Sequence, residues 1–443
     1  MKLKLLGNNN PNYDTLTQIL VNRNIPYEEV SHYMNTTDDD ISDPMLFGPH
    51  MDNGAKLLCK HIANNSKTLV ICDCDCDGFT AAALLINYIY ELFPGFVNNN
   101  LKWFVHEGKQ HGLVDVMNYI ENNDFKLIIC PDSSSNDYKQ HKILKEKGID
   151  VLVLDHHEAE KLSEDACVIN NQLSNYPNKD LSGVGVTWQF CRYIDKLLNK
   201  NNANYYLDLV ALGNTGDMMS LTSIETKHLI NKGFLPKNIH NPYIYEMWQK
   251  NKFKLGEHIT SIDAAFYIVP MINAVQRSGT LEEKELLFKS MLSYEAFNMI
   301  PSTKRGHKLG EMERLVDQAV RMSTNVKNRQ TRTQDAGVDL LEKKIKKENL
   351  LDRKVLLFTL DKGQVDPNIA GLIANKFATK YQRPCCILTK SMQIDPAHTF
   401  MNQDGEKLYV TSASRVIYQG SARGYELTGM TTFKDVCEAA GAE

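Results

Sequence analysis

Three aspartates alternate with three cysteines in the stretch CDCDCDG, residues 72–78. In an extended chain successive side chains point to opposite faces, so Asp73, Asp75 and Asp77 would share one side. Carboxylates this close repel one another unless they are protonated or a cation neutralises them, and oxygen ligands suit hard divalent ions such as Mg²⁺ and Mn²⁺. The stretch therefore predicts a site for a hard cation or, taken alone, a solvated acidic turn.

The interleaved cysteines, Cys72, Cys74 and Cys76, could act as soft metal ligands. Small apolar side chains that pack behind a strand are the commoner arrangement, so we assign these three to the core. The ten cysteines of the chain are scattered, and no Cys-x-x-Cys pair is matched by a second pair or by spaced histidines, as a structural zinc site would require. We therefore expect neither disulfides nor such a zinc site.

Further acidic residues and histidines follow other apolar runs. Asp132 ends the run KLIICPD, the triplet Asp155-His156-His157 ends VLVLDHH, and Asp217 lies in LVALGNTGDMMSL. Carboxylates and imidazoles distributed over several strand ends are what a two-metal site needs, in which a shared carboxylate bridges two ions roughly 3.5–4 Å apart and a water is activated against phosphorus. A purely structural role for the histidine pair is the weaker explanation, because four acidic segments accompany it.

The elements that must position these residues lie between residues 67 and 221. The apolar runs TLVICDCD, KLIICPD and IDVLVLDHH are separated by the amphipathic stretches AAALLINYIYELF and YKQHKILKEKG. This alternation predicts an α/β fold with a parallel sheet covered on both faces. Gly78 suits a tight strand-to-helix turn, with a helix beginning near residues 79–83. Because ligands bind at the carboxyl ends of such strands, the acidic segments should converge on one crevice.

The second half of the chain has a different pattern. Residues 301–349 are charged and mostly helical in pattern, with a weak break around residues 331–337. After them the run KVLLFTL, the amphipathic stretch IAGLIANKFATKYQ and the run PCCILT predict a second, smaller α/β unit. We expect a first domain over residues 1–300, a helical connector over 301–351 and a second domain over 352–443.

Length and composition are those of an ordinary globular protein. The 443 residues exceed the usual size of one domain, and 50 Lys and Arg against 54 Asp and Glu give a net charge of −4. The most apolar stretch, residues 79–93, is interrupted by polar residues and is shorter than a membrane span. The amino-terminal residues carry no signal-peptide pattern. We expect a cytoplasmic protein without a membrane segment.

Taken together, the four acidic segments resemble the motifs of the DHH phosphoesterase superfamily: DCDCDG the first, PDSSSND the second, VLDHHE the third and DLVALGNTGDM the fourth. Within it the chain is most similar to the RecJ family of single-strand-specific exonucleases, through HEGKQHGL (106–113), SGVGVTWQF (182–190) and PMINAVQRSG (270–279). QVDPNIAGLIANKF (364–377) and QGSARG (419–424) resemble the second domain of that family, the DHHA1 type.

The resemblance implies a role for each matching residue. It implies that the metals are bound by Asp75, Asp77, Asp132, His156 and Asp217, with Asp132 as the bridge. Asp73, Asp155 and His157 would support these ligands or hold the scissile phosphate. Substrate phosphates would be contacted by Asn273 and Arg277, and a turn formed by Gly420, Ser421, Ala422 and Arg423 would hold the nucleic-acid backbone. A guanidinium and a Gly-Ser turn are chemically suited to phosphate.

Three departures from the family pattern stand out. The second motif has Ser134 where the family usually has glycine, so this turn is expected to differ. The Gly-Gly-His motif of the DHHA1 domain would lie just beyond Gly441, so we expect a second domain that is truncated there or lacks that histidine. The chain also leaves no room for the OB-type domain with which long family members grip single strands, which argues against processive cleavage.

The resemblance implies a two-metal exonuclease that uses Mn²⁺ or Mg²⁺, cuts single-stranded DNA from the 5′ end and releases mononucleotides during DNA repair and recombination. Single-stranded DNA is the expected partner, with single-strand-binding or other replication and repair proteins beside it. An alternative is a phosphodiesterase of the same superfamily for short oligonucleotides or cyclic dinucleotides, although those smaller enzymes generally lack the Asn-Ala-x-x-Arg segment and the long connector. Another alternative is a catalytically silent scaffold that binds single strands or replication proteins. The retained acidic residues argue against the scaffold, since unneutralised carboxylates are costly to keep.

Overall fold

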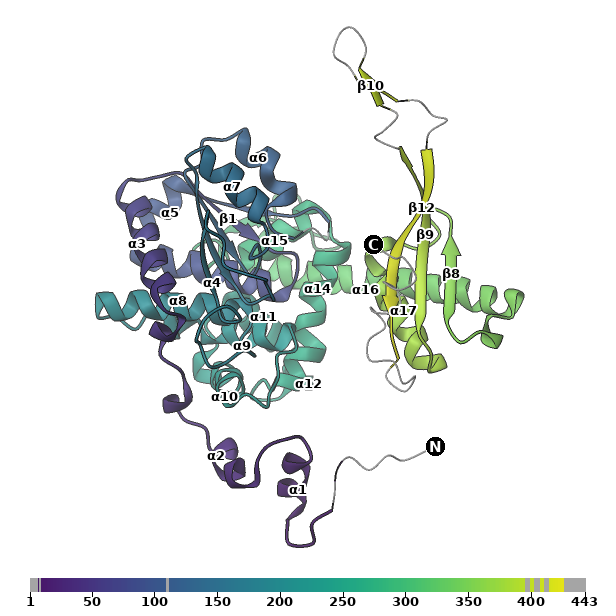
Figure 1. The fold of residues 1–443 in the computed structure, drawn as a ribbon, viewed down its shortest axis with the longest axis horizontal. Helices are drawn as coiled ribbons and strands as arrows, with labels where there is room; N and C mark the ends of the chain where they lie inside the picture. Colours follow the sequence, from purple (N-terminus) through teal and green to yellow (C-terminus); the bar gives the residue numbers. More distant parts are fainter. Residues whose placement is uncertain are drawn as a thin grey trace. The chain divides into compact units, whose positions relative to one another are not determined.

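The structure is a computed structural model that describes residues 7, 9–108, 111–394, 399–401, 407–409 and 414–425 (Figure 1). The chain divides into two compact units, Met1–Thr324 and Asn325–Glu443. The division falls within the segment in which a domain boundary was expected. The two units are described in turn.

Unit 1 is built on a five-stranded parallel sheet with the strand order β2-β1-β3-β4-β5. The strands are β1 (Thr68–Cys72), β2 (Leu101–Val105), β3 (Leu127–Pro131), β4 (Asp150–Asp155) and β5 (Cys167–Asn170). Every residue of β1 and of β3 is buried, which is why these strands read as continuous apolar runs in the sequence. The expected parallel sheet is therefore confirmed.

Helices cover both faces of this sheet. One face packs against α6, α7 and the turn before α6, in a core that includes Ile71, Ile128, Leu144 and Val153. The opposite face packs against α3, α4 and α8, so that Gly54 of α3 lies close to Leu152, Ile169 and Phe190. The helices up to α8 are α1 (Thr15–Val21), α2 (Val30–Met34), α3 (Pro49–Ala63), α4 (Cys76–Leu92), α5 (Pro94–Asn100), α6 (Met117–Glu121), α7 (Tyr138–Glu146) and α8 (Gly183–Leu198).

A helical layer follows the sheet in sequence. Its helices are α9 (Leu207–Gly216), α10 (Ile224–Gly233), α11 (Pro242–Lys250), α12 (Lys252–Leu255), α13 (Ser261–Asp263), α14 (Val269–Ser278) and α15 (Leu281–Met291). A π-helical turn over Ala264–Ile268 leads into α14. Among the described residues no helix has both the length and the apolar character needed to cross a membrane.

The connection between β1 and α4 differs from the expectation. α4 begins at Cys76, earlier than the predicted start near residues 79–83, and Asp75 caps it by accepting a hydrogen bond of 3.0 Å from Gly78 N. The strand therefore ends at Cys72 and the helix begins at Cys76, so the predicted alternation of faces through residue 77 is wrong. Helix capping by an aspartate outweighs strand continuation at this position.

The segment expected to be a connector is one continuous helix, α16 (Leu315–Glu348), preceded by a small hairpin of β6 (Met299–Pro301) and β7 (Met312–Arg314). The predicted helix break around residues 331–337 is absent. Gly337 serves packing instead, since a Cβ on it would lie 2.7 Å from Cδ1 of Ile373. A glycine that admits a neighbouring side chain gives the same sequence signal as one that ends a helix.

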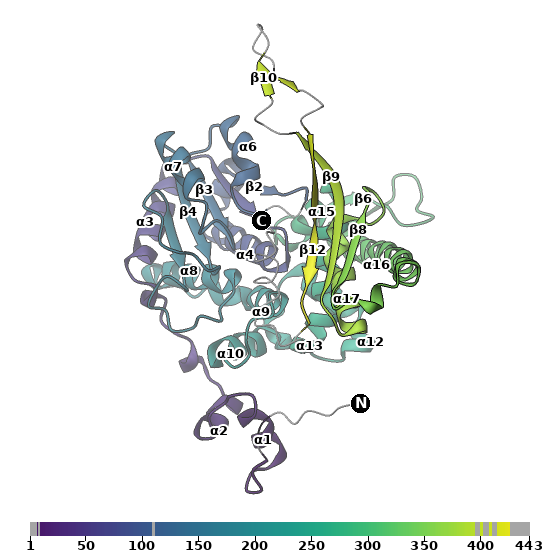
Figure 2. The ribbon, with the colours of Figure 1, turned by 45° about the vertical axis from the view of Figure 1, so that its right-hand side comes forward.

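Unit 2 holds a three-stranded sheet with the order β12-β9-β8, in which β8 (Leu356–Leu360) runs parallel to β9 (Cys385–Ile394) and β12 (Ser414–Arg423) runs antiparallel to β9 (Figure 2). Helix α17 (Pro367–Tyr381) packs on the sheet and shares its apolar core. A short ladder joins β10 (Thr399–Met401) to β11 (Lys407–Tyr409). The expected second α/β unit is thus present, and the predicted Gly-Gly-His position beyond Gly441 lies outside the described residues.

Candidate metal centre

The first acidic segment lies where β1 meets α4. Asp73 follows the strand and is 1% exposed, while Asp77 lies in the first turn of the helix and is equally buried. A Cβ on Gly78 would stand 2.5 Å from Cβ of Asp73, so a glycine is needed where the helix passes the end of the strand. The local fold thereby brings two buried carboxylates to the carboxyl edge of the sheet.

The amino-terminus of α8 holds Asp77 in place. The Asp77 carboxylate accepts hydrogen bonds from Gly183 N at 2.6 Å and from Ser182 Oγ at 3.0 Å. Added Cβ atoms would stand 2.3 Å from Asp132 Oδ1 if placed on Gly183, and 2.4 Å from Asp77 Oδ1 if placed on Gly213. Helix N-termini stabilise negative charge, and the glycines let the backbone approach both carboxylates closely.

His156 lies close to carboxylates from three of the acidic segments. Its Nε2 lies 3.2 Å from Asp132 Oδ1, 3.5 Å from Asp217 Oδ2 and 3.9 Å from Asp77 Oδ2. The expected convergence of the acidic segments on one crevice is therefore found. His156 follows β4, Asp132 follows β3, and Asp217 follows α9.

Three overlapping groups of side chains could each hold a cation, because one ligand atom from every member lies within 4.8 Å of the others. The groups are Asp77, His156 and Asp217; Asp132, His156 and His157; and Asp73, Asp75 and Asp132. Asp132 and His156 each belong to two of them. An arrangement of this kind can hold two ions with a shared ligand, and all five residues predicted to bind metal are in it.

Three buried polar atoms of this centre have no hydrogen-bond partner among the described residues: Asp73 Oδ1, and the pair Asp132 Oδ1 and His156 Nε2, which lie 3.2 Å apart without forming a hydrogen bond. Leaving such atoms unsatisfied costs about 1–3 kcal/mol each. The atoms are carboxylate oxygens and an imidazole nitrogen, which are suitable donors for Mn²⁺ or Mg²⁺. The residues present therefore fit the hard divalent ions that the fold implies.

The pKa values of the residues in the centre also favour the binding of a cation. Burial, and then the charges of Asp77 and Asp75, raise the pKa of Asp132 well above its usual value. Burial and the same two neighbours raise the pKa of Asp217 to about 7. Burial lowers the pKa of His156, which leaves its imidazole neutral and able to bind a cation. A divalent ion would offset the repulsion that these carboxylates otherwise impose on one another.

Asp155 supports the two histidines that follow it. Its Oδ1 lies 2.7 Å from Nδ1 of His157 and accepts a hydrogen bond of 2.8 Å from His156 N. Its Oδ2 accepts a hydrogen bond from Ser135 N at 3.0 Å. Burial alone would raise the pKa of Asp155, but the hydrogen bond and charge of His157 outweigh it and hold that pKa below its usual value. The same hydrogen bond raises the pKa of His157 to about 9, so His157 is a cation at neutral pH.

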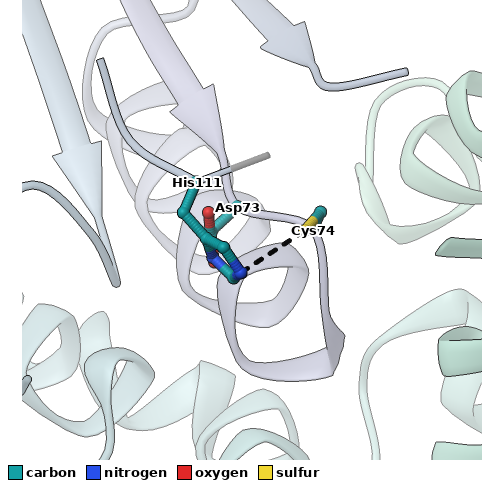
Figure 3. Close-up of side chains that lie close together, drawn as sticks. All are labelled: Asp73, Cys74 and His111. Carbon is teal, nitrogen blue, oxygen red and sulfur yellow. Dashed lines mark hydrogen bonds and ion pairs between the residues drawn. The ribbon is translucent and has the colours of Figure 1, made fainter. Parts of the chain in front are cut away.

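Two further residues reach the centre: His111, which the sequence did not single out, and Cys74, which was assigned to the core (Figure 3). His111 Nδ1 lies 2.7 Å from Asp73 Oδ2, and His111 Nε2 lies 3.9 Å from the Sγ of Cys74. The hydrogen bonds to Asp73 and then to Cys74 raise the pKa of His111 to about 11. Cys74 is buried, as expected, but it faces this imidazole as well as the core. The sequence feature that could have indicated this role is the position of His111 in HEGKQHGL, a segment between two strands that are followed by aspartates.

A cleft of about 590 Å³ opens beside the centre. Its lining residues come from two segments and the loop around His111: His111, Gly112, Asp132–Asp137, Asp155, His157 and Glu158. Ser134, which replaces the usual glycine, keeps a left-handed backbone with φ of 79°. The glycine-like turn is thus retained, and the hydroxyl it adds is buried without a partner among the described residues.

The two residues predicted to contact substrate phosphate in unit 1, Asn273 and Arg277, lie four residues apart on α14 and so share one face of that helix. Both are half-buried, and the Oδ1 of Asn273 has no hydrogen-bond partner among the described residues. α14 packs against α4, which carries Asp77, and against α9, which ends next to Asp217. The helix therefore adjoins the elements of the metal centre.

The predicted turn at residues 420–423 is a strand. Gly420, Ser421 and Arg423 belong to β12 and pair with β9, because the extended backbone continues to Arg423. Ser421 and Arg423 reach toward α17 of the same unit, where a Cβ on Gly371 would lie 2.9 Å from Nη2 of Arg423 and 3.4 Å from Oγ of Ser421. Arg423 is exposed and donates a hydrogen bond of 2.7 Å to the carbonyl of Ala422.

Solved structures with the same fold include RecJ of Thermus thermophilus in complex with Mn²⁺. It has a TM-score of 0.61 and 19% identity, and the match covers 83% of this chain and 50% of that one. A structure of exonuclease RecJ bound to manganese has a TM-score of 0.60 and 19% identity, with coverage of 78% and 82%. At this identity the likeness shows the fold.

Sequence comparisons show the family. Residues 67–214 match the model described as the DHH family, N-terminal domain. The Bacillus subtilis protein named as the SPbeta prophage-derived single-strand DNA-specific exonuclease YorK is 33% identical over 436 residues, which are 98% of this chain and 70% of YorK. The single-stranded-DNA-specific exonuclease RecJ of Bacillus subtilis is 21% identical over 84% of this chain and 44% of its own length. The chain therefore belongs to the DHH family, among its RecJ-like members.

Proposed function

We propose that the protein is a metal-dependent exonuclease that hydrolyses single-stranded DNA from the 5′ end and releases mononucleotides. The observation that carries this proposal is the sharing of Asp132 and His156 between adjacent groups of potential ligands. Relatives named as single-strand DNA-specific exonucleases support the substrate, and RecJ structures with manganese or magnesium support the cofactor. A role in DNA repair and recombination, beside single-strand-binding or replication proteins, is the corresponding cellular proposal.

Asp75, Asp77, Asp132, His156 and Asp217 would hold the ions. When bound, two hard divalent ions supply Lewis-acid activation of a water and of the scissile phosphate. Asp155 fixes the orientation and charge of His157, whose side chain is 53% exposed and lines the cleft. The His157 imidazolium would bind a phosphate oxygen, because a charge-assisted hydrogen bond to an anion is stronger than a neutral one. Asp73 would keep His111, which also lines the cleft, protonated.

Residues away from the centre would position the strand. Asn273 and Arg277 on α14 would contact a neighbouring phosphate, with the guanidinium gripping two of its oxygens. Ser421 and Arg423 would hold the backbone farther along, which makes unit 2 a substrate-binding domain. Their place on the edge strand β12 leaves the guanidinium exposed for such a contact.

The test of this proposal is a substrate-length series of end-labelled single strands, digested with Mn²⁺ or Mg²⁺. A preference for long strands supports the exonuclease. Turnover confined to dinucleotides or cyclic dinucleotides would favour the small-substrate phosphodiesterase. Strand binding without any hydrolysis would favour the silent scaffold.

Replacing Asp155 by Asn is expected to lower kcat/KM on single-stranded DNA by about 10–100-fold, the usual loss when a group that orients a metal-binding histidine is removed. The amide leaves the backbone contacts of Asp155 largely in place but loses the charge that holds His157 protonated. Asp150→Asn is the matched control, because Asp150 starts the same strand and contacts Lys60 and His61 away from the centre. Equal effects of the two substitutions on kcat/KM would contradict the assigned role.

Replacing Arg423 by Ala is expected to slow the turnover of long single strands. The free-energy barrier should rise by about 1–3 kcal/mol, which is the contribution of one charge-assisted phosphate contact. Dinucleotide hydrolysis should change much less if Arg423 holds the backbone of a strand several nucleotides from the metals. Arg353→Ala, at another exposed arginine of unit 2, is the control. The log-log slope of strand binding against salt should also fall by roughly one unit. A loss that is the same at every substrate length would mean that Arg423 holds the end of a two-nucleotide substrate.

A further inference from the structure

A thiol and an imidazole meet beside the candidate metal centre. Cys74 lies in the connection between β1 and α4, and His111 lies in the loop that precedes α6. The Sγ of Cys74 and the Nε2 of His111 are 3.9 Å apart, and Nδ1 of the same ring lies 2.7 Å from Asp73 Oδ2 (Figure 3). One ligand atom of each of the three residues lies within 4.8 Å of the others.

The orientation of the His111 ring is that of a metal ligand. Histidines that bind a metal through one nitrogen almost always donate the other N–H to a carboxylate or a carbonyl. Asp73 receives that N–H here, and Nε2 is left facing the sulfur. At ordinary zinc distances of about 2.0 Å to nitrogen and 2.3 Å to sulfur, a tetrahedral ion holds its two ligand atoms about 3.5 Å apart. The observed separation of 3.9 Å needs a closure of only a few tenths of an ångström.

The chemistry of this trio differs from that of the neighbouring carboxylates. Thiolate and imidazole favour borderline-soft ions such as Zn²⁺, Co²⁺ and Cd²⁺, whereas carboxylate oxygens suit Mn²⁺ and Mg²⁺. The trio is also reachable, because the side chain of His111 is 60% exposed and lines the cleft. Asp73 links the two regions, since it also belongs to the group with Asp75 and Asp132 and its buried Oδ1 has no partner among the described residues.

We propose that Cys74 and His111, oriented by Asp73, form a separate binding site for a thiophilic divalent cation such as Zn²⁺, and that its occupancy inhibits the enzyme. On binding, the thiol of Cys74 and Nε2 of His111 each release a proton to solvent, and no oxidation state changes. Inhibition follows because a cation held by Cys74 and His111 occupies part of the cleft and fixes Asp73, which borders the hard-ion positions. The inhibition rests on the proposed function, whereas the binding does not.

The binding test uses Co²⁺ as the probe, with the full reduced chain and excess Mg²⁺ to fill the hard-ion positions. A thiolate bound to Co²⁺ gives a charge-transfer band in the near ultraviolet, and Zn²⁺ should displace it. Cys74→Ser should lose the band, and His111→Ala should weaken Co²⁺ binding by about tenfold or more. Cys59→Ser, at an exposed cysteine of α3, is the matched control and should keep the band. A band of wild-type strength in Cys74→Ser would overturn the site.

The activity arm compares, for each variant, the rate with Mn²⁺ alone and the rate with added Zn²⁺. The wild type and Cys59→Ser should be inhibited by Zn²⁺ at concentrations that displace Co²⁺, and Cys74→Ser should resist. Equal inhibition of Cys74→Ser and the wild type would overturn the inhibitory role. If no variant turned over any strand with Mn²⁺ alone, the proposed function would fail, and the Co²⁺ band would still decide whether the site exists.

Discussion

Replacing Asp132 by Asn should reduce the hydrolysis of single-stranded DNA at least about a thousandfold while the protein stays folded. Asp132 contributes to two of the groups of potential ligands, so its loss disturbs both ion positions. Metal ions contribute several kcal/mol of transition-state stabilisation, and each 1.36 kcal/mol corresponds to a factor of ten in rate. The measurement is single-turnover cleavage of an end-labelled strand in saturating Mn²⁺.

Thermal melting separates this loss from misfolding. Without divalent ions, Asp132→Asn should melt at or above the wild-type temperature, because burial and like charges already penalise the Asp132 carboxylate. Asp195→Asn is the matched control, since Asp195 is also buried but accepts hydrogen bonds from Tyr88 and Ala203 away from the centre. The control should lose stability and keep its activity. Near-normal turnover of Asp132→Asn, or its failure to fold, would refute the bridging role.

Removing divalent ions with EDTA should abolish hydrolysis, and either Mn²⁺ or Mg²⁺ should restore it. The buried carboxylates around His156 have raised pKa values, and Asp132 Oδ1 has no hydrogen-bond partner among the described residues, so a bound cation would stabilise them. A ligand present at 100 times its Kd stabilises the folded state by about 2.7 kcal/mol, so the melting temperature should rise by several degrees on adding Mn²⁺. Asp132→Asn should show a smaller rise. Full activity in EDTA would contradict a metal-dependent mechanism.

Three of the five strands of the parallel sheet, β1, β3 and β4, could be predicted because they are buried on both faces and therefore appear as apolar runs that end in aspartate. Their parallel pairing then places Asp132 and His156 at one edge of the sheet. The same reasoning failed at residues 73–77. The alternating pattern predicted an extended chain there, but capping by Asp75 starts α4 at once. Asp73 still lies against the start of the helix, because a Cβ on Gly78 would stand 2.5 Å from its Cβ.

Two other predictions were wrong because glycine occurs both in turns and at sites of close packing, and the sequence does not distinguish these two roles. Glycine at 420 suggested a turn, but it lies within β12, where a Cβ would stand 1.9 Å from the carbonyl oxygen of Ile387. Gly337 suggested a helix break and instead admits Ile373. The role of His111 could not be predicted, because its partner Asp73 lies 38 residues away, beyond α4, α5 and β2, and the loop that carries His111 has no periodic pattern. Contacts of this kind depend on tertiary structure.

The central claim, that this metal centre degrades single-stranded DNA from the 5′ end, is tested most directly by the first product released from a 5′-labelled strand. The full chain, loaded with Mn²⁺, is mixed with that strand and, separately, with the same strand in a duplex. We predict labelled mononucleotide from the earliest time points on the single strand, little from the duplex, and none in EDTA. Label that first appears in longer 5′-terminal fragments, or that is released equally from the duplex, would contradict the account.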